Sequence, residues 1–512
     1  RQLRINSIQS NPIQSMSTVL SPPSTKEEDP VPVVIAGAGI VGLVLALSLE
    51  KHLGIKCRIV DQAQAFNDGV GAGIGMYPNG LRVIRDISPL LLAKIQHEGI
   101  PYRQRRWERH DGSEIMTADE SVISDDSYAY NLEPMGIRRW KLQKILYQAV
   151  LKKGMVVEFG KRVSKAIPLP NNNKNNNNTQ NNLIRLEFQD GSHLLTELLL
   201  AADGAKSAVR DSLPTKSKLT LTGTTCMYGV ATLPYDIPHG LALPSSRTTH
   251  CHGAFYATDV REQCFQFHMP TPNMNNHTNN KKTTTNNGDS ENDDGDDDST
   301  TSILHAIWDP LSSQLCQEEC HGLAQLLADD GWNEEKYLQP LRHAEKAIKV
   351  PFALLEPHLE TYVYHQRIVL VGDAAHPPVP YLGQGAQQGL EDAGTLALLL
   401  KGMHVIASND NDDNNDSFFD SVSLDRALQL YDTMRVPRTR DILERSKEHG
   451  LMQQKRADSR NRRHARAREE QLQRDVFFHE TLEDVLPGAT YDYKQAVNQT
   501  LKEEPLGVIV ES

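Results

Sequence analysis

The chain has 512 residues, of which 38% are hydrophobic, and its formal net charge is −12. It is longer than one minimal domain and long enough to bury a large core. No run approaches the ~18 apolar residues that span a bilayer, so we expect neither a membrane-spanning helix nor membrane attachment.

Three tracts rich in Asn and Asp differ from the rest of the chain, at 171–182, 274–300 and 408–417. Such tracts cannot bury enough apolar surface to offset the entropy of ordering them, so we expect disordered loop insertions. The second carries seven acidic residues against two lysines, and the third carries four acidic residues. Most of the net charge therefore comes from the insertions and says little about partners.

The first 30 residues are expected to form a disordered tail. Its opening segment "RQLRINSIQSNPIQS" has arginines and serines but no acidic residue, a weak transit-peptide pattern. That pattern leaves an organelle open beside the cytoplasmic location that we expect. The six cysteines show no CxxC pair and no metal-ligand spacing, which favours a reduced intracellular chain without a metal site.

Regular structure is predicted to begin with a strand at 33–36, a helix to about residue 53 and a second strand at 56–60. The next predicted elements are a helix at 138–153, strands at 155–168 and 183–188, and a strand that runs into a loop at 197–210. Mostly β segments follow, closed by a helical stretch at 318–348. The last are a buried strand in "RIVLVGD" and helices at 384–402 and 424–475.

This alternation predicts an α/β fold. We expect a Rossmann-like nucleotide-binding domain built from the discontinuous segments 31–214 and 357–450, with a β-rich substrate domain inserted at 215–356. A basic helical extension and tail follow at 451–512. Because the basic stretch lacks interleaved aromatic residues and contains acidic ones, we expect a solvated helix and no nucleic-acid partner. A homodimer contact or weak attachment to a membrane surface is the next option.

A glycine motif, Gly37-x-Gly39-x-x-Gly42, lies between the first strand and its helix. Gly37 would permit a tight turn, Gly39 would let the backbone approach a pyrophosphate, and Gly42 would allow close helix–strand packing. Asp61 closes the second strand, where a ribose hydroxyl partner is expected. The motif predicts a dinucleotide site, but it does not say which dinucleotide binds there.

Two later segments join this motif. Asp203 and Gly204 follow an apolar strand in "AADGAKSAVR". In "GDAAHPPVPYLGQGAQQGLEDA", Gly372 and Asp373 end a buried strand, where a carboxylate often accepts hydrogen bonds from ligand hydroxyls. The same segment continues with three prolines and with the residues that open a helix whose positive end could stabilise negative charge on a ring, namely Gly383, Gln384, Gly385 and Ala386.

These three segments, in this order, resemble those of the single-component FAD-dependent aromatic hydroxylases, the group A flavoprotein monooxygenases that include salicylate hydroxylases and zeaxanthin epoxidases. "IRRWKLQKIL" is a fourth match, and the likeness runs from about residue 33 to 450. The resemblance implies FAD as cofactor, NAD(P)H as co-substrate, and hydroxylation of an aromatic or related ring by O2 through a flavin C4a-hydroperoxide.

The resemblance also implies roles for individual residues. The motif glycines would hold the pyrophosphate, Asp61 the adenosine ribose, and Arg139 the FAD chain. Asp203 is associated with the pyrophosphate and with NAD(P)H use, Asp373 would bind the ribitol, and Gly383 to Ala386 would face the isoalloxazine. We assign no catalytic side chain and expect His376 to fix its loop.

The substrate is expected to be a small, aromatic molecule held on the inner face of the β-rich domain. Candidate lining residues, only some of which should touch it, are Tyr228, His252, Phe255, Tyr256, Phe265, Phe267 and Trp308. Two alternatives stay open: an isoprenoid epoxidase or flavin-dependent reductase on the same fold, and a flavin-binding protein without turnover.

Overall fold

The computed structural model describes residues 29–66, 71–119, 132–170, 183–246, 248–249, 251–270, 314–315, 317–403, 405, 417–458 and 491–503. The predicted tail up to residue 28, the tracts 171–182 and 274–300, most of the tract 408–417 and the candidate Trp308 lie outside these residues.

The first of two large sheets is a mixed sheet in the order β18-β19-β11-β1-β2-β8, with β10 and β9 added beside β11. Its four central strands are parallel neighbours. The strands come from three separate parts of the chain: β1 (Val31–Ala36), β2 (Arg58–Val60), β8 (Val157–Glu158), β9 (Val163–Pro168), β10 (Ile184–Phe188), β11 (His193–Ala201), β18 (Val363–Tyr364) and β19 (Ile368–Leu370).

Two apolar helices pack beside this sheet. α1 (Ile40–Leu53) is buried along most of its length, and it ends at Gly54, whose left-handed backbone (φ 72°) lets its N–H bond to Glu50 O. α9 (Gly385–Gly402) contacts α1, α2 and α10, and also α13. A Cβ on Gly389 of α9 would lie 2.5 Å from Val41 of α1, so the two helices approach as closely as they do because this residue is glycine.

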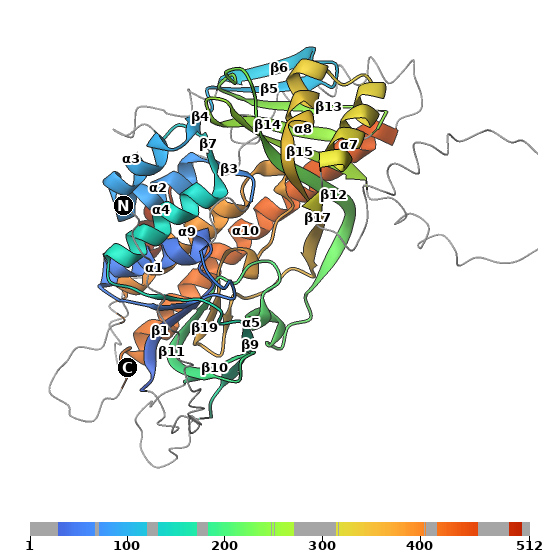
Figure 1. The fold of residues 1–512 in the computed structure, drawn as a ribbon. Coiled ribbons are helices and arrows are strands. Elements are labelled where there is room, and N and C mark those ends of the chain that lie inside the picture. The colour runs from blue at the N-terminus through green and yellow to red at the C-terminus, as the bar shows by residue number, and fades with distance from the viewer. Residues whose placement is uncertain are drawn as a thin grey trace, which may run out of the picture.

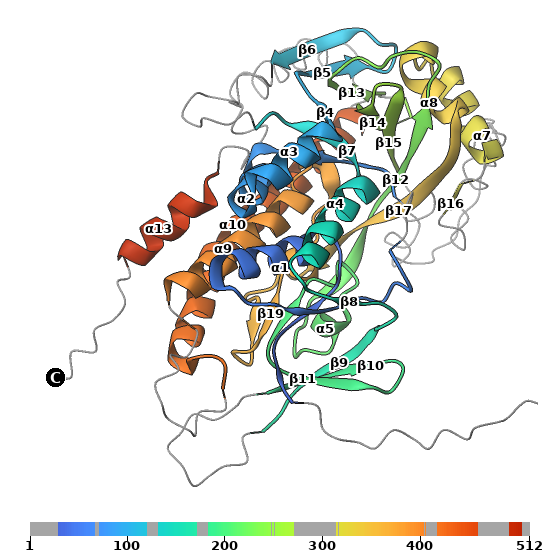
Figure 2. The ribbon, with the colours of Figure 1, turned by 60° about the vertical axis from the view of Figure 1, so that its left-hand side comes forward.

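The other helices surround these two or cover the second sheet (Figure 2). Around the first sheet lie α2 (Pro78–Ile87), α3 (Pro89–His97), α4 (Arg139–Lys152), α5 (Ala208–Asp211), α10 (Ser421–Asp458) and α13 (Tyr493–Glu503), with the short 3-10 turns η4 (Gly372–Ala374) and η5 (Pro380–Leu382). Near the second sheet lie α7 (Gln317–Asp329), the π-helical turn η3 (Glu334–Leu338) and α8 (Gln339–Arg342).

The second large sheet has the order β16-β17-β12-β15-β14-β13-β5-β6. Its long strands β12 and β17 run down one side of the molecule toward the first sheet (Figure 1). Its strands are β5 (Gln104–Arg109), β6 (Glu114–Asp119), β12 (Lys218–Thr232), β13 (Leu241–Ser245), β14 (His252–Asp259), β15 (Glu262–Pro270), β16 (Gln314–Leu315) and β17 (Ala344–Glu356). A small sheet lies beside it, formed by β3 (Gly73–Met76), β7 (Met135–Arg138) and β4 (Ile100–Pro101).

The predicted fold class is confirmed: discontinuous segments build a Rossmann-like sheet, a β-rich part is inserted, and helices close the chain. Two details differ. β5 and β6 lie in the range 31–214, yet β5 pairs with β13 in the second sheet. The prediction of a helical stretch at 318–348 was wrong at its C-terminal end. There β17 begins at Ala344 and pairs with β12. Cross-strand pairing outweighs helix propensity in "AEKAIKV".

Candidate functional site

The carboxyl ends of four parallel strands meet at one edge of the first sheet. Val60, Ala36, Ala201 and Leu370, at the ends of β2, β1, β11 and β19, lie side by side in register. The residues that follow include Asp61, Gly37, Asp203 and Asp373. The structure therefore brings together predicted residues that are up to 336 positions apart in the chain.

The glycine turn after β1 has the geometry of an anion cradle. Gly37 has a φ of 106°, and a Cβ there would lie 2.3 Å from Ala202 O. A Cβ on Gly42 would lie 2.0 Å from Gly37 O, whereas one on Gly39 would meet no atom within 4 Å. Gly39 caps α1, whose first turn holds no acidic residue, and the first backbone N–H groups of a helix have no partner within it.

Asp61 fastens the turn to the second strand. Its Oδ2 accepts a hydrogen bond from Ala38 N at 2.6 Å, and its Oδ1 accepts one from Ala63 N at 2.8 Å. Gln143 of α4 donates to Ala38 O at 2.8 Å from the other side. Asp61 thus orients the glycine turn, and its remaining lone pairs could accept from a ribose hydroxyl.

Asp203 has an acceptor with no partner. Its Oδ2 accepts from Val209 N at 3.2 Å, while its buried Oδ1 has no hydrogen bond among the described residues. Burial raises the pKa of Asp203, and hydrogen bonds from Ser207 and neighbouring backbone oppose the rise. Gly204 has a φ of 83° with open space beside it. A buried oxygen without a donor fits a site whose donor belongs to a ligand.

Asp373 lies in the short turn η4 that follows β19 at the edge of the first sheet. Asp373 is exposed, but the protein packed around it displaces enough solvent to raise the pKa of its carboxyl group. The charges of His376 and Arg139 oppose this rise. Arg139 is itself exposed at the start of α4, and its charge also acts on Tyr228 of the second sheet. Arg139 therefore lies in the region between Asp373 and the second sheet.

The start of α9 closes this region. Gly383 is exposed with a φ of 64°, and a Cβ there would lie 3.1 Å from the Tyr77 ring. Gly385 and Ala386 are half-buried in the first turn, which holds no acidic residue. The side chain of Gln384 is turned inward, where its Oε1 accepts from Asn79 Nδ2 at 3.0 Å, so only its backbone can meet a cofactor.

A buried ion network stands behind these loops, and sequence reasoning missed most of it. Asp392 of α9 accepts hydrogen bonds from Gly372 N at 2.8 Å and Arg435 Nε at 2.6 Å, and it lies 2.6 Å from His376 Nε2. Arg435 also donates to Glu391 at 2.7 Å. His376 fixes its loop, as expected. The signal was an adjacent Glu-Asp pair, the two acidic residues of a helix that is otherwise mostly small and apolar.

The charges of this network are balanced in the interior. Burial alone would raise the pKa of Asp392, but His376 and Arg435, with their hydrogen bonds, lower it to about 2. Arg438 donates to Glu391 through two nitrogens, at 2.6 and 2.8 Å. Because both carboxylates stay ionised and paired, the loop from Gly372 to His376 is held rigidly under the site.

The two faces of the second sheet separate the candidate lining residues. Tyr228 and Tyr256 lie on the face that packs on Ala72 and Tyr102 near the small sheet, and His252 shares this face by alternation along β14. Phe255, Phe265 and Phe267 point the other way, into a core with Trp332 and Tyr337 beneath α7 and α8. These three phenylalanines are core residues and do not line the site.

Two tyrosines missed by sequence reasoning lie at the junction of the sheets. Tyr77 accepts a hydrogen bond from Arg105 Nη2 at 3.2 Å and lies against Gly383. Tyr381 of η5 packs against Phe352 of β17. Neither residue belongs to a recognisable motif, and each reaches the site only through the tertiary fold.

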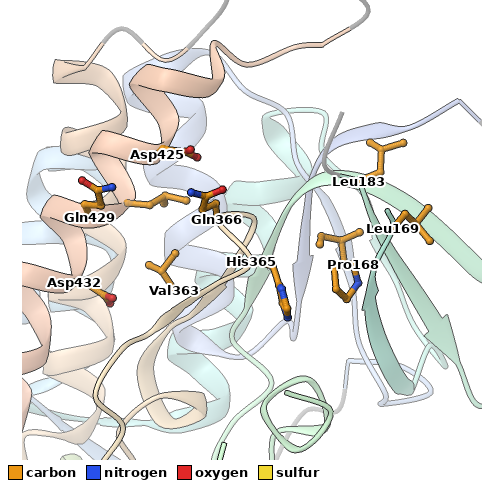
Figure 3. A pocket seen from close by; sticks show the side chains of 11 residues that line it. Pro168, Leu169, Leu183, Val363, His365, Gln366, Asp425, Gln429 and Asp432 are labelled. Carbon is orange, nitrogen blue, oxygen red and sulfur yellow. The ribbon is translucent and has the colours of Figure 1, made fainter. Parts of the chain in front are cut away.

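Cavities also lie away from these loops. One of about 470 Å³ has Asp425, Gln429 and Asp432 on one side and Pro168, Leu169 and Leu183 on the other (Figure 3). A groove of about 280 Å³ runs between β12, β17 and α10, with Tyr381 and Val379 in its wall. None of the predicted cofactor residues lines either cavity.

Across the described residues, no helix is long and apolar enough to cross a membrane.

Comparison with known proteins identifies the family. A family model described as an FAD binding domain matches residues 30–312, more than half of the chain. The chain belongs to the FAD-dependent aromatic hydroxylase family. The sequence-based expectations of FAD as cofactor and of monooxygenase activity are thereby confirmed, and use of NAD(P)H is typical of the family.

Curated relatives of this monooxygenase resemble it over most of their length. A salicylate hydroxylase from Pseudomonas putida is 26% identical over 429 residues, covering 81% of this chain and 84% of the relative. A 3-amino-4-hydroxybenzoate 2-monooxygenase, PtnB3, from Streptomyces platensis is 27% identical over 423 residues, covering 82% and 87%. These relatives favour ring hydroxylation over the epoxidase and reductase alternative.

A solved structure shares the fold. Klebsiella pneumoniae HpxO, complexed with FAD and uric acid, superposes with a TM-score of 0.60 at 19% identity, covering 93% of this chain and 98% of that one.

Proposed function

We propose that this monooxygenase hydroxylates a phenolic ring compound held between the carboxyl edge of the first sheet and the Tyr228 face of the second. The observation that carries the proposal is that three segments distant in sequence meet at that edge. They bring together the Asp203 carboxylate, whose Oδ1 has no partner among the described residues, and the exposed Asp373. The two relatives described above are named for ring substrates that carry a hydroxyl group.

The residues present fit FAD. The α1 N-terminus beside Gly39 has room for a pyrophosphate, and Asp203 would lie near that group. Asp61 would accept from the ribose and Asp373 from the ribitol. Arg139 would contact the FAD chain, and Gly383 to Ala386 would face the ring. When bound, FAD takes up reducing equivalents from NAD(P)H and supplies the activated oxygen for transfer to the substrate.

The protein's own part in the reaction is to bind, orient and exclude water. The positive end of α9 stabilises negative charge on the reduced ring, since its first turn offers N–H groups and no acidic side chain. The network of Asp392, His376 and Arg435 keeps the Gly372 loop in place. Tyr228, which is half-buried, would provide a flat surface for an aromatic substrate, whereas Tyr256 is buried behind it in the cluster with Tyr102.

We further propose that segments 31–214 and 357–450 form the FAD-binding part and 215–356 the substrate part, with the β5–β6 hairpin added to the latter. Small molecules and O2 would be its partners, with no nucleic acid. Whether the protein forms a homodimer is tested by measuring the molar mass of the purified protein with light scattering.

The proposal is tested by product analysis. The FAD-loaded protein is incubated with NADH or NADPH and a panel of phenols under oxygen labelled with ¹⁸O2, and the products are read by mass spectrometry. We expect one phenol to gain a single labelled oxygen. Oxidation of the nicotinamide that yields only hydrogen peroxide with every phenol would contradict the assigned substrate class.

A further inference from the structure

One buried histidine on the substrate face has no hydrogen bond. His268 of β15 is 7% exposed, and its Nε2 has no partner among the described residues. It lies opposite Cys226 of β12 and His252 of β14 in the sheet register. Its remaining neighbours are rings: Phe352 at 5.1 Å and Tyr381 at 5.4 Å between centroids, both edge to face.

A histidine that served only packing would lower the stability of the fold at this position. A buried polar nitrogen without a partner destabilises the fold, whereas a leucine or phenylalanine would fill an aromatic cluster without leaving a polar atom unpaired. Burial also lowers the pKa of His268 to about 4. The imidazole is therefore uncharged near neutral pH, with one nitrogen that can accept and one that can donate a hydrogen bond.

His268 lies between the second sheet and η5, the turn that precedes α9. On the same face, the next cross-strand pair is Tyr228 and Gln266, and both are half-buried. Tyr381 on its other side belongs to η5, two residues before Gly383. A ring held over Tyr228 would therefore lie beside His268.

We propose that His268 is a specificity-determining residue that makes an uncharged hydrogen bond to a hydroxyl group on the substrate ring. The inference rests on the proposed function, because it assumes that the substrate lies against the Tyr228 face of the second sheet. A site built to bond a hydroxyl discriminates strongly against the analogue that lacks it, since its own polar group is then left unpaired. The expected substrate class is an aromatic ring bearing a hydroxyl beside the acceptor nitrogen.

The test compares ligands that differ by one hydroxyl. Dissociation constants for salicylate, 4-hydroxybenzoate and benzoate are measured on the FAD-loaded protein from the change in the visible flavin spectrum. For His268→Leu we expect the hydroxylated probe that binds the wild type more tightly to weaken about tenfold, which corresponds to one net hydrogen bond. The dissociation constant for benzoate should stay within twofold of the wild type.

Two further variants separate this role from a structural one. His268→Asn keeps hydrogen-bonding capacity and should recover part of the affinity. If His268→Leu does not fold, His268→Phe replaces it, because phenylalanine also removes the hydrogen bond and fits the aromatic cluster. His193→Leu, at an exposed histidine that begins β11, is the matched control and should bind all probes as the wild type does.

The outcomes are distinguishable. If His268→Leu weakens benzoate as much as the hydroxylated probe, or weakens neither, the proposal is wrong while the proposed function stands. If the wild-type holoprotein binds neither hydroxylated probe, the phenolic substrate class and this inference fail together.

Discussion

At the residue scale, Arg435 is the cation on which two buried carboxylates depend. It is fully buried and donates to Asp392 at 2.6 Å and Glu391 at 2.7 Å. Removing one partner of a buried ion pair costs about 3–5 kcal/mol, because it leaves an uncompensated charge. We expect Arg435→Met to lose that much stability and to release FAD, as measured by urea unfolding followed through flavin fluorescence.

The control lies on the same helix. Arg445 of α10 is exposed and pairs with Asp441 one turn away, and such surface pairs contribute about 0.3–0.5 kcal/mol. Arg445→Met should therefore unfold at nearly the wild-type urea concentration. Equal losses in the two variants would show that the buried network does not hold the loop.

His268 makes stability depend on pH. Burial lowers its pKa in the folded protein to about 4, below the ordinary value of 6.5, so between pH 4 and 6.5 the unfolded chain binds a proton more readily than the folded one. Stability that is present above pH 6.5 is lost as the pH falls toward 4, by about 3 kcal/mol at most. The titratable groups that face it are Cys226, His252 and Tyr381.

The variant His268→Leu should lack this part of the acid sensitivity. We expect the melting temperatures of variant and wild type to diverge between pH 6.5 and pH 4, with the variant falling less. Parallel curves would mean that the imidazole is not desolvated in solution, and the cost assigned to its burial would be wrong.

At the element scale, two glycines of α1 serve different purposes. A Cβ on Gly42 would lie 2.0 Å from Gly37 O, whereas a Cβ on Gly39 would stand in open space. Gly42→Ala should push the helix from β1 and cost about 3 kcal/mol, measured on the apoprotein. Gly39→Ala should leave apoprotein stability unchanged but weaken FAD at least tenfold, because the added methyl group occupies the path of the pyrophosphate. FAD affinity unchanged in Gly39→Ala would contradict the cradle.

Elements with strong local patterns were predictable. The helix expected to end near residue 53 ends at Leu53, and the helix expected at 384–402 spans Gly385–Gly402. What failed depends on partners far away in the sequence. The strand beginning at Ala344 has a helix-compatible sequence and becomes β17 only because it pairs with β12. The part of the helix expected at 424–475 that continues past Asp458 falls outside the described residues.

At the scale of the whole molecule, the residues at the cofactor-binding edge of the first sheet were predictable from sequence. Only some of the residues on the substrate-facing side of the second sheet were. The motif residues follow strand ends, and parallel strands in one sheet bring their ends together. The aromatic residues of β14 and β15 offered no such rule, because alternation assigns faces only when the core side is known. Tyr256 and Phe255 are neighbours in sequence, yet they lie on opposite faces of the second sheet. His268, Tyr77 and Tyr381 take their places from packing between the two sheets.

The most direct test of the central claim is anaerobic reduction of the bound flavin, followed by stopped-flow absorbance. NADH or NADPH is mixed with the FAD-loaded protein, with and without salicylate or 4-hydroxybenzoate. If the protein is an NAD(P)H-dependent hydroxylase of phenolic rings, one phenol should accelerate reduction, and readmitted oxygen should convert that phenol to its hydroxylated product. A protein that binds no FAD, or whose flavin neither nicotinamide reduces with any phenol, would contradict the account.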